Sequence, residues 1–542
     1  MSRSIVTAFL STVGSRLVGL VVTAAITPLL IHYLGVGTYG EYATIMSVFA
    51  LLTVFMSSGT NSGVKKYIAE QRSMPNWKDH VFGYYFRLAT LLAVLAAIGF
   101  AVAAHLGLVA MLWGEKYTPY FYLLGGMALA VQYREYVRRT LMGLKLEHVS
   151  EPLTVLYRVV FGVIAVALAA LGFGVPGIIV AQVAASLVAV AVGLYVVRKH
   201  LSLEKVTGST PSRFPDSELF SFNHETIAYV FLLTSLYHID VLMLESAASS
   251  EIVGYYKAAL VLVQFLWILP RSVQGVMIQS TSDLWEQGRL GRITDLASRT
   301  TRYVLLLTLL LAMGMAALAS TFVPLYLGEQ MTPAVTPLLL LLPGTVGFAV
   351  ARPLLAISHA KGDVKTLIAA TWASATLNFA LNLNLIPMYG AAGAALATTI
   401  GYASLPLFNA YAARELGYDP LNDLRPVRIA VTTVIAAVPI YLLPSIIEND
   451  VLELVIIPVV GFVVFAAAAL VSGAVDVEEL SDFLDSLPGP LGGDGRSIDG
   501  SIGSRKAFRS DGGVPLAART QRLLVLVGLA LVVLGIVAMA NV

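Results

Sequence analysis

The chain has 542 residues, of which 57% are hydrophobic and only 13% are charged. Soluble domains carry about 25% charged residues, and here apolar runs of about 20 residues recur from end to end. The composition therefore predicts a polytopic membrane protein and excludes a soluble domain of ordinary size. The net charge of +2 gives no reason to expect a nucleic-acid partner, and the absence of cysteine excludes disulfides and thiolate chemistry.

The N-terminal stretch MSRSIVTAFL resembles the start of a signal peptide, but the apolar segment is too long, contains Arg16 and leads to no A-x-A-like cleavage site. We therefore interpret it as a retained first transmembrane helix. Apolar runs predict fourteen helices, with a fifteenth candidate at 523–540. The fourteen lie near residues 5–33, 40–60, 83–106, 119–140, 153–172, 176–197, 223–246, 253–274, 301–323, 334–356, 365–386, 391–412, 427–446 and 452–472.

The distribution of Lys and Arg tests this topology, because cytoplasmic loops are enriched in both. With the N-terminus in the cytoplasm, 32 of the 35 basic residues fall in inside loops or at helix ends. Lys116 and Lys257 fall outside, and Arg16 remains within the first helix. A single miscounted helix would destroy this alternation. We expect a multi-pass protein of a prokaryotic plasma membrane with a cytoplasmic N-terminus.

The sequence repeats at an offset of 214–216. GEYA at 40–43 matches GYYKA at 254–258, GEKYTP at 114–119 matches GEQMTP at 328–333, and Arg138 matches Arg352. Two weaker matches pair AEQR with WEQGR and GVPGIIVA with GAAGAALA. Each repeat holds six predicted helices, so both copies enter the membrane in the same direction and should be related by a pseudo-two-fold axis along the membrane normal.

These observations predict an all-α polytopic fold with two six-helix lobes facing each other, an arrangement typical of alternating-access transporters. The segment after the fourteenth helix is rich in Gly, Ser, Asp and Pro and is typical of a mobile linker. The predicted parts are an N-terminal lobe (1–200), a cytoplasmic interlobe linker (201–221), a C-terminal lobe (222–414), helices 13 and 14 (415–473), a flexible cytoplasmic linker (474–522) and an extra transmembrane helix (523–542).

Arg16 lies about 16 Å along the first helix from Ile5, near the middle of a hydrocarbon core about 30 Å thick. Without a partner it would cost about 2.5–3.5 kcal/mol. Thr12, Gly19 and Thr23 share its face. Two interpretations remain open: packing through small residues with Arg16 reaching cytoplasmic phosphates, or a wet cavity in which Arg16, Thr12 and Thr23 bind an anionic substrate.

The seventh predicted helix carries His238 and Asp240 near its outer end. Asp240 is a candidate gate ion pair or coupling-ion site, with an interfacial charge as the alternative. Gln264 lies within the eighth predicted span, where amides form interhelical hydrogen bonds more often than they bind ligands. No Walker A motif and no metal-ligand spacing is present, and the first outer loop lacks the acidic pair of a membrane glycosyltransferase. We therefore expect no catalytic residues, no cofactor, no metal and no enzyme activity.

The segments LGVGTYGEYA and DVLMLESAASSEIVGYYKAA resemble the polysaccharide-biosynthesis (O-antigen-type) flippases of the multidrug/oligosaccharidyl-lipid/polysaccharide exporter superfamily. The resemblance covers roughly residues 1–475. It implies a V-shaped cavity lined by helices 1, 2, 7 and 8, a cationic residue matched by Arg16, and an acidic position matched by Asp240. In the second lobe the first cavity cation is Arg271.

The leading hypothesis is a flippase that moves a polyprenyl- or dolichyl-(di)phosphate-linked oligosaccharide to the outer leaflet for surface polysaccharide or N-glycan synthesis. The alternatives are a lipid II-type flippase and a cation-coupled multidrug antiporter. Membrane lipids are expected contacts, and glycosyltransferases or a glycan polymerase or ligase are candidate partners. The candidate substrate-binding residues are Arg16, Thr12, Thr23, Gln264 and Arg271, and the candidate gate residues are Asp240 and His238.

Overall fold

A computed structural model of the chain describes residues 18–479 apart from 20, 207, 209, 210, 212, 222 and 223. Thr12, Arg16 and the candidate helix at 523–540 therefore lie outside the described residues. Within them the chain is helical and contains no strand, which confirms the predicted fold class. Ten helices are long and apolar enough to cross a membrane, and the bent pair α10 and α11 makes an eleventh among the described residues.

The first described helical segment is Val21–Leu34. The longer helices that follow are α2 (Val36–Ala69), α3 (Trp77–His105), α5 (Thr118–Gly143), α6 (Glu147–Ala170), α7 (Gly174–Val197), α9 (His224–Ala247), α10 (Ser250–Phe265), α11 (Ile268–Glu286), α12 (Leu290–Leu327), α13 (Val335–Lys361), α14 (Val364–Glu415), α15 (Pro426–Leu442) and α16 (Asp450–Val471). The short elements are α4 (Leu108–Trp113), α8 (Asp216–Ser221), η1 (Glu115–Tyr117), η2 (Leu203–Val206), η3 (Glu329–Ala334) and η4 (Leu443–Ser445).

Thirteen of the fourteen predicted spans coincide with described helices, and α14 contains two of them across the non-helical residue Gly390. The first predicted span, 5–33, overlaps the described segment Val21–Leu34 and otherwise lies largely outside the described residues. The boundaries differ where polar residues continue a helix past its apolar run, so α2 and α12 are longer than predicted. The eighth predicted span is bent by 51° between α10 and α11.

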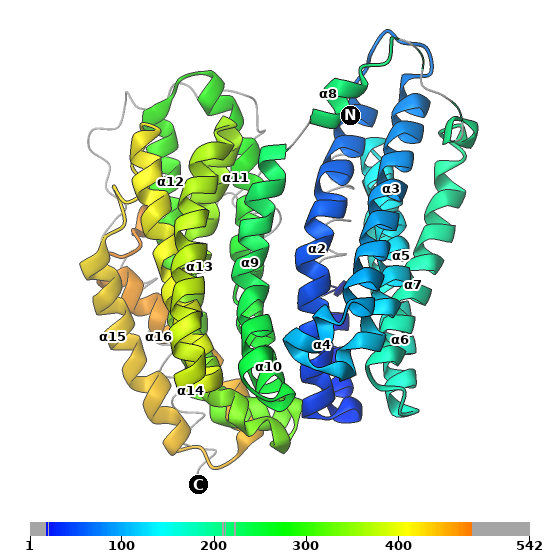
Figure 1. The fold of residues 1–542 in the computed structure, drawn as a ribbon. Coiled ribbons are helices and arrows are strands. Elements are labelled where there is room, and N and C mark those ends of the chain that lie inside the picture. The colour runs from blue at the N-terminus through cyan, green and yellow to red at the C-terminus, as the bar shows by residue number, and fades with distance from the viewer. Residues whose placement is uncertain are drawn as a thin grey trace. The chain divides into compact units, whose positions relative to one another are not determined.

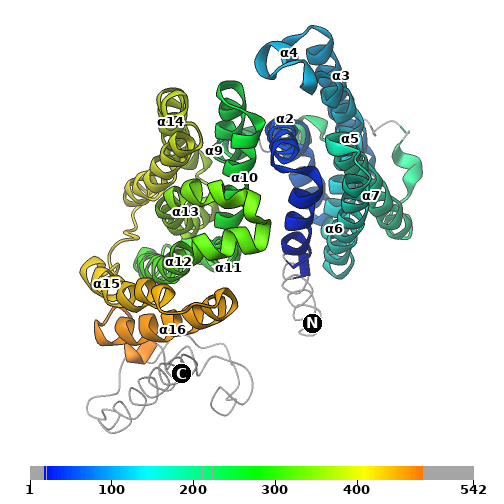
Figure 2. The same ribbon diagram turned by 90° about the horizontal axis from the view of Figure 1, so that it is seen from below.

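The described residues form two compact units, of which the first contains 18–290 and 323–418 and the second contains 291–322 and 419–479. Within the first unit we call Val21–Leu34 with α2–α7 the N half, and α9–α11 with α13 and α14 the C half (Figure 1). The view along the helices in Figure 2 places α2 of the N half beside α9 and α10 of the C half.

Backbone geometry repeats between the halves as the sequence offset predicts. Gly114 (φ 98°, ψ 159°) precedes η1, and Gly328 (φ 99°, ψ 150°) precedes η3. Gly174 and Gly390 both have a positive φ, of 57° and 54°. Because only glycine adopts such angles readily, the matched glycines preserve the same chain turns in both repeats.

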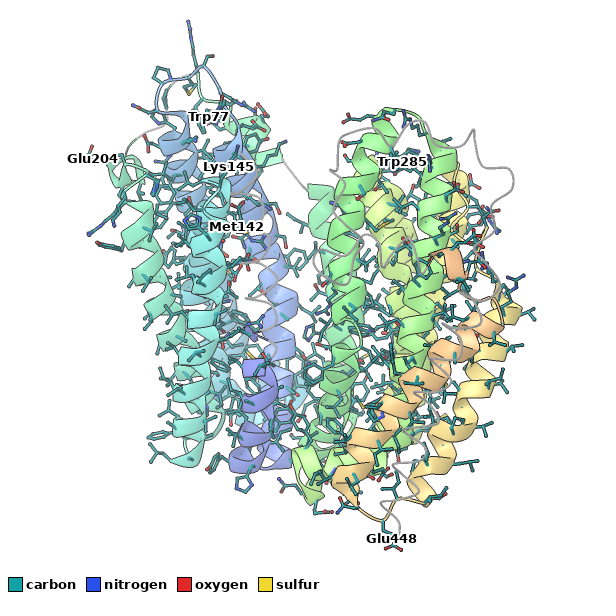
Figure 3. The ribbon with its side chains drawn as sticks, turned by 180° about the vertical axis from the view of Figure 1, so that it is seen from behind. Trp77, Met142, Lys145, Glu204, Trp285 and Glu448 are labelled. Carbon is teal, nitrogen blue, oxygen red and sulfur yellow. The ribbon has the colours of Figure 1, made fainter. Side chains whose placement is uncertain are left out.

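The segment between the halves docks on the N half at one end, which we call the α8 end; the opposite end carries α4 (Figure 1). Figure 3 shows Trp77, Lys145 and Glu204 at this α8 end. The Phe214 ring packs 5.5 Å from that of Trp77. Arg72 donates two hydrogen bonds to Glu218 in α8, at 3.1 and 2.7 Å, and they hold the pKa of this carboxyl below its usual value.

The second unit has its own apolar core, formed by side chains such as Ile429, Ile440 and Val460. Arg302 is fully buried and donates hydrogen bonds to Asp423 at 2.7 Å and to Glu479 at 2.5 and 2.7 Å. Arg425 in turn pairs with Asp423 and Asp476. The predicted linker of 474–522 thus begins with residues that are held in place, because Asp476 and Glu479 pair with half-buried or buried arginines. The rest of the predicted linker lies outside the described residues.

Candidate transport site

The two halves meet closely at the α4 end, where α2 crosses α10. A Cβ at Gly40 would overlap the carbonyl oxygen of Ser250, and a Cβ at Gly254 would overlap the carbonyl oxygen of Val36. These two contacts interchange under the offset of 214, so the crossing lies on the predicted pseudo-two-fold axis. A symmetric contact of this kind is the signature of an isologous interface. Only glycine allows the two backbones to come so close.

An ion cluster surrounds this crossing. The Lys116 ammonium lies 3.1 Å from Glu41 of the N half and 3.5 Å from Glu245 of the C half, and it donates a hydrogen bond to Ser250 at 2.6 Å. The Glu245 side chain is only 3% exposed and also accepts hydrogen bonds from Ser250 at 2.7 Å and Thr44 at 3.4 Å. The cluster therefore ties the two halves together at the α4 end through a desolvated carboxylate.

The contact continues along α2 and α9, which run antiparallel. His238 Nδ1 lies 3.0 Å from Ser47 Oγ, and the rings of Phe55 and Phe231 are 4.9 Å apart. Nearer the α8 end, Ile227 packs against Gly59. The structure thus places the predicted gate residue His238 in direct contact with the other half.

Asp240, the other predicted gate residue, lies inside the C half and is fully buried. Its carboxylate accepts hydrogen bonds from the hydroxyls of Tyr256 and Thr398. Asn378 donates to Thr398 at 3.4 Å, Asn382 donates to Asn378 at 3.2 Å, and the side-chain oxygen of Asn382 has no partner. This set of one carboxylate with hydroxyl and amide oxygens suits a proton or a small hard cation.

No group of three or more His, Asp or Glu side chains that could hold a metal occurs among the described residues. The oxygen set around Asp240 contains a single carboxylate, so its chemistry favours a monovalent cation over a tightly bound divalent one.

The predicted substrate-binding residues are spread over both halves. The Thr23 hydroxyl donates to the Gly19 carbonyl at 2.8 Å, so its donor is used within its own helix. Gln264 lies near the end of α10 and is half-buried. Arg271 in α11 has an exposed side chain whose guanidinium lies 5.6 Å from the centre of the Trp267 ring. The structure brings Gln264 and Arg271 to the bend between α10 and α11.

Several arginines lie deeper in helices than the charge count assumed, and Arg158 and Arg352 are examples. Arg158 lies in the middle of α6, where a Cβ at Gly19 would overlap its guanidinium. Arg352 lies within α13 and is 6% exposed. Counting both as helix-end charges was therefore wrong, and Arg16 is not the single arginine within a span. The repeat match between Arg138 and Arg352 was the signal that could have drawn attention to Arg352.

Comparisons with known families agree with this architecture. The family model described as "Polysaccharide biosynthesis protein" matches residues 2–275, and the model described as "Lipid II flippase MurJ" matches residues 226–460. The membrane protein MJ1068 of Methanocaldococcus jannaschii is 21% identical over 277 residues. That match spans 50% of this chain and 53% of the relative, so the chain aligns with about half of its length.

Solved structures share the fold at low sequence identity. The lipid II flippase MurJ in an inward closed conformation aligns with a TM-score of 0.67 and 14% identity, covering 85% of this chain and 98% of that chain. An inward-facing multidrug resistance MATE family transporter aligns with a TM-score of 0.60 and 13% identity, covering 72% and 94%. A transporter of Pyrococcus furiosus aligns with a TM-score of 0.53 and 16% identity, covering 78% and 96%. The matched family model and the two-lobed fold show that this chain belongs to the polysaccharide biosynthesis protein family, within the multidrug/oligosaccharidyl-lipid/polysaccharide exporter superfamily of membrane transporters.

Proposed function

We propose that the chain moves a polyprenyl- or dolichyl-(di)phosphate-linked oligosaccharide from the cytoplasmic to the outer leaflet by alternating access. The α8 end then faces the cytoplasm of a prokaryotic cell, where Lys and Arg are concentrated, and the α4 end faces outward. Glycosyltransferases supply the lipid-linked saccharide, and a glycan polymerase or ligase consumes it outside. The membership of the family supports a lipid-linked saccharide as the class of substrate.

The observation that carries this proposal is the symmetric crossing of Gly40 and Gly254, closed by Lys116 and Glu245. A contact built equally from two repeats can open by rotation of one half against the other, because no covalent element crosses it. An outward opening at this crossing would release a saccharide that entered from the α8 end. The closed α4 end corresponds to the state that receives substrate from the cytoplasm.

The cluster around Asp240 supports coupling to a cation. A buried carboxylate within a membrane span is costly without a compensating proton or charge. The Lys257 ammonium acts electrostatically on Asp240 without forming a described ion pair with it, and the unpartnered oxygen of Asn382 adds a ligand. Binding of a proton or Na⁺ in the C half would change the packing of α9 against α14 and so bias the position of α9 along α2. Coupling at this cluster accounts for transport without an ATP-hydrolysing motif.

A lipid II-type substrate is the second candidate, favoured by the MurJ family model over residues 226–460. Deleting the gene and identifying the lipid-linked saccharide that accumulates on the inner leaflet distinguishes the two. A saccharide with the peptide stem of a cell-wall precursor would favour the second candidate. The absence of any accumulated lipid-linked saccharide would contradict both.

A cross-linking experiment tests alternating access directly, because the chain contains no cysteine. We replace Ser47 and His238 together by cysteine. A short bis-methanethiosulfonate reagent then joins α2 to α9 through a reversible cross-link. We expect the cross-linked protein to stop restoring surface glycan in the deletion strain and to recover after reduction. The matched control pair is Ala97 and Gly125 of the N half, whose Cβ positions lie 3.4 Å apart and whose cross-link should leave transport intact. Transport with Ser47 and His238 joined would contradict the mechanism.

A further inference from the structure

A column of buried polar side chains runs along α14, between its part before Gly390 and its part after it. The first part contributes four side chains at intervals of three or four residues, so they share one face of the helix. The second part contributes three more. We call all seven the α14 column, and none is more than 8% exposed: Thr371, Ser374, Asn378, Asn382, Thr398, Ser404 and Asn409.

Hydrogen bonds connect the column across the two parts of α14. Asn378 donates to Thr398 at 3.4 Å, and Ser404 donates to Ser374 at 3.1 Å. Thr398 also donates to Asp240 at 3.0 Å. The order of these contacts places Asp240 at one end of the column, and the column continues from there toward the start of α14.

Three buried oxygens of the column have no hydrogen-bond partner. They are the side-chain oxygens of Asn382 and Asn409 and the hydroxyl of Thr371. The amide nitrogens of the two asparagines are already used, because they donate to Asn378 and to the Leu405 carbonyl. Burial of a polar atom without a partner is costly. Since these oxygens lie near both ends of the column, they provide acceptors for a ligand along its whole length.

The N half shows that the fold does not need this column. At offsets of 214–216, the residues that match Asn378 and Asn382 are 162–164 and 166–168, which contain only Gly, Ala, Val, Leu and Ile. Asp240 is likewise matched by alanine or isoleucine. The same helices therefore pack in the N half through apolar side chains, and the polar column serves a role that belongs to the C half.

The column approaches the α8 end at the start of α14. Lys361, which ends the preceding helix, lies 5.0 Å from the centre of the Trp285 ring, and Figure 3 shows Trp285 at that end. Thr371 lies seven residues from the start of α14, which is about 10 Å. Asp363 caps α14 there, with its carboxylate accepting a hydrogen bond from the Thr366 N–H at 3.2 Å. This carboxylate adds a negative charge that favours the approach of a cation.

We propose that the α14 column is a passage for a small monovalent metal cation between Asp240 and the cytoplasm, separate from the substrate path between the two halves. This inference rests on the proposed function, which sets the α8 end in the cytoplasm, and deepens it. Hydroxyl and amide oxygens coordinate hard cations, and none of the seven column side chains is an acid or a base that would relay a proton. The coupling cation can therefore exchange with the cytoplasm while the α4 end stays closed.

Single cysteines test the passage, because the chain contains none. The probe is Ag⁺, a small monovalent cation that binds soft thiolate ligands. Inside-out membrane vesicles that carry Ser374→Cys or Thr371→Cys are treated with Ag⁺, and the remaining thiol is measured by maleimide labelling after denaturation. Both cysteines should react with Ag⁺ at least about tenfold faster than a cysteine in a dry core. Excess Na⁺ should slow the reaction by occupying the column.

The matched control for a dry core is Ala189→Cys. Ala189 is fully buried in an apolar cluster of the N half and lies eight residues before the end of α7, so its depth is close to that of Thr371. A second variant tests the direction of the passage. Thr371→Val keeps the shape of the side chain and removes its hydroxyl, so it should slow the Ag⁺ reaction of Ser374→Cys by about tenfold, the worth of a hydrogen bond to a charged group.

The inference is overturned if both column cysteines react as slowly as Ala189→Cys, which is the result that simple packing or a proton relay would give. It is also overturned if Na⁺ gives no protection, or if Ag⁺ reacts faster from the outer face. Thr371→Cys keeps the test valid if Ser374→Cys does not fold. Failure of the proposed function has a different signature. In that case the deletion strain accumulates no lipid-linked saccharide, although Ag⁺ still reaches the column from the α8 end.

Discussion

Gly40 and Gly254 occupy equivalent positions in the two repeats and lie against each other's helix, with the Gly40 Cβ position directed at Ser250 and the Gly254 Cβ position directed at Val36. Such close approach is possible only for glycine, as in other small-residue helix crossings within membranes. The two glycines therefore occupy repeat-related positions at the place where the two halves come together.

We predict that Gly40→Ala opens the α4 end. The added methyl group would overlap the Ser250 carbonyl, and overpacking of this kind costs about 1–3 kcal/mol. In a Ser47→Cys background, the rate at which a membrane-impermeant maleimide labels position 47 from outside should rise by about tenfold. Gly37→Ala, one turn away with open space around its Cβ, is the control. Equal labelling of the two variants would show that the crossing is not a closure.

Lys116→Met should weaken the same closure by another route. Glu245 would remain buried without its cation, and an uncompensated buried charge is destabilising. Cysteine labelling at position 47 should rise by about five- to tenfold. Glu115→Gln, which changes an exposed neighbouring charge with no described ion pair, should have no effect. An unchanged labelling rate in Lys116→Met would show that the ion cluster does not hold the α4 end closed.

Asp240→Asn should keep the fold and abolish cation dependence. The amide oxygen can still accept hydrogen bonds from Tyr256 and Thr398, but the negative charge is lost. Transport into proteoliposomes of the lipid-linked saccharide extracted from the deletion strain should no longer respond to an imposed Na⁺ or proton gradient. Asp283→Asn, an exposed acid of α11, should respond normally. A gradient response retained by Asp240→Asn would place coupling elsewhere.

The buried charge network of the second unit predicts a stability effect. Arg302→Ala leaves Glu479 without its guanidinium partner and Asp423 with Arg425 alone, and it should lower the free energy of unfolding by about 3–5 kcal/mol. Thermal unfolding of the purified chain measures this, with the exposed Arg299→Ala as control. A chain truncated after residue 473 should unfold at a lower temperature than one truncated after 479, because only the longer chain keeps Asp476 and Glu479. Equal stability of the two truncations would contradict a role for residues 474–479.

Acid should release α8 from the N half. The hydrogen bonds from Arg72 hold the pKa of Glu218 below its usual value of 4.5. For a carboxyl with a lowered pKa, the stabilisation is present at neutral pH and is lost as the pH falls through that lowered value. Hydrogen exchange of residues 214–221, corrected for intrinsic rates, should therefore accelerate between neutral pH and a pH well below 4.5. Glu218→Gln should exchange quickly at both pH values, and a pH-independent wild type would contradict the prediction.

The sequence by itself determined the membrane class, the positions of most described helices, the repeat and the family. The membrane class depends on hydropathy averaged over about 20 residues, and the repeat depends on short matches such as GEKYTP and GEQMTP. Both signals lie within short stretches of the chain, so they can be found without knowing which segments come together in space. Asp240, His238 and Arg271 could be singled out as polar groups near or within apolar runs, but their partners could not.

Only the tertiary structure decided which charges are balanced. Lys116 meets Glu245 across a separation of more than one hundred residues, whereas Arg352 lacks the acids that Arg138 has. Charge compensation depends on which side chains of distant segments come within about 4 Å, and hydropathy carries no information about that. The helix-end assignment of Arg158 and Arg352 was wrong for the same reason, because helix ends are set by packing and capping as well as by apolar length.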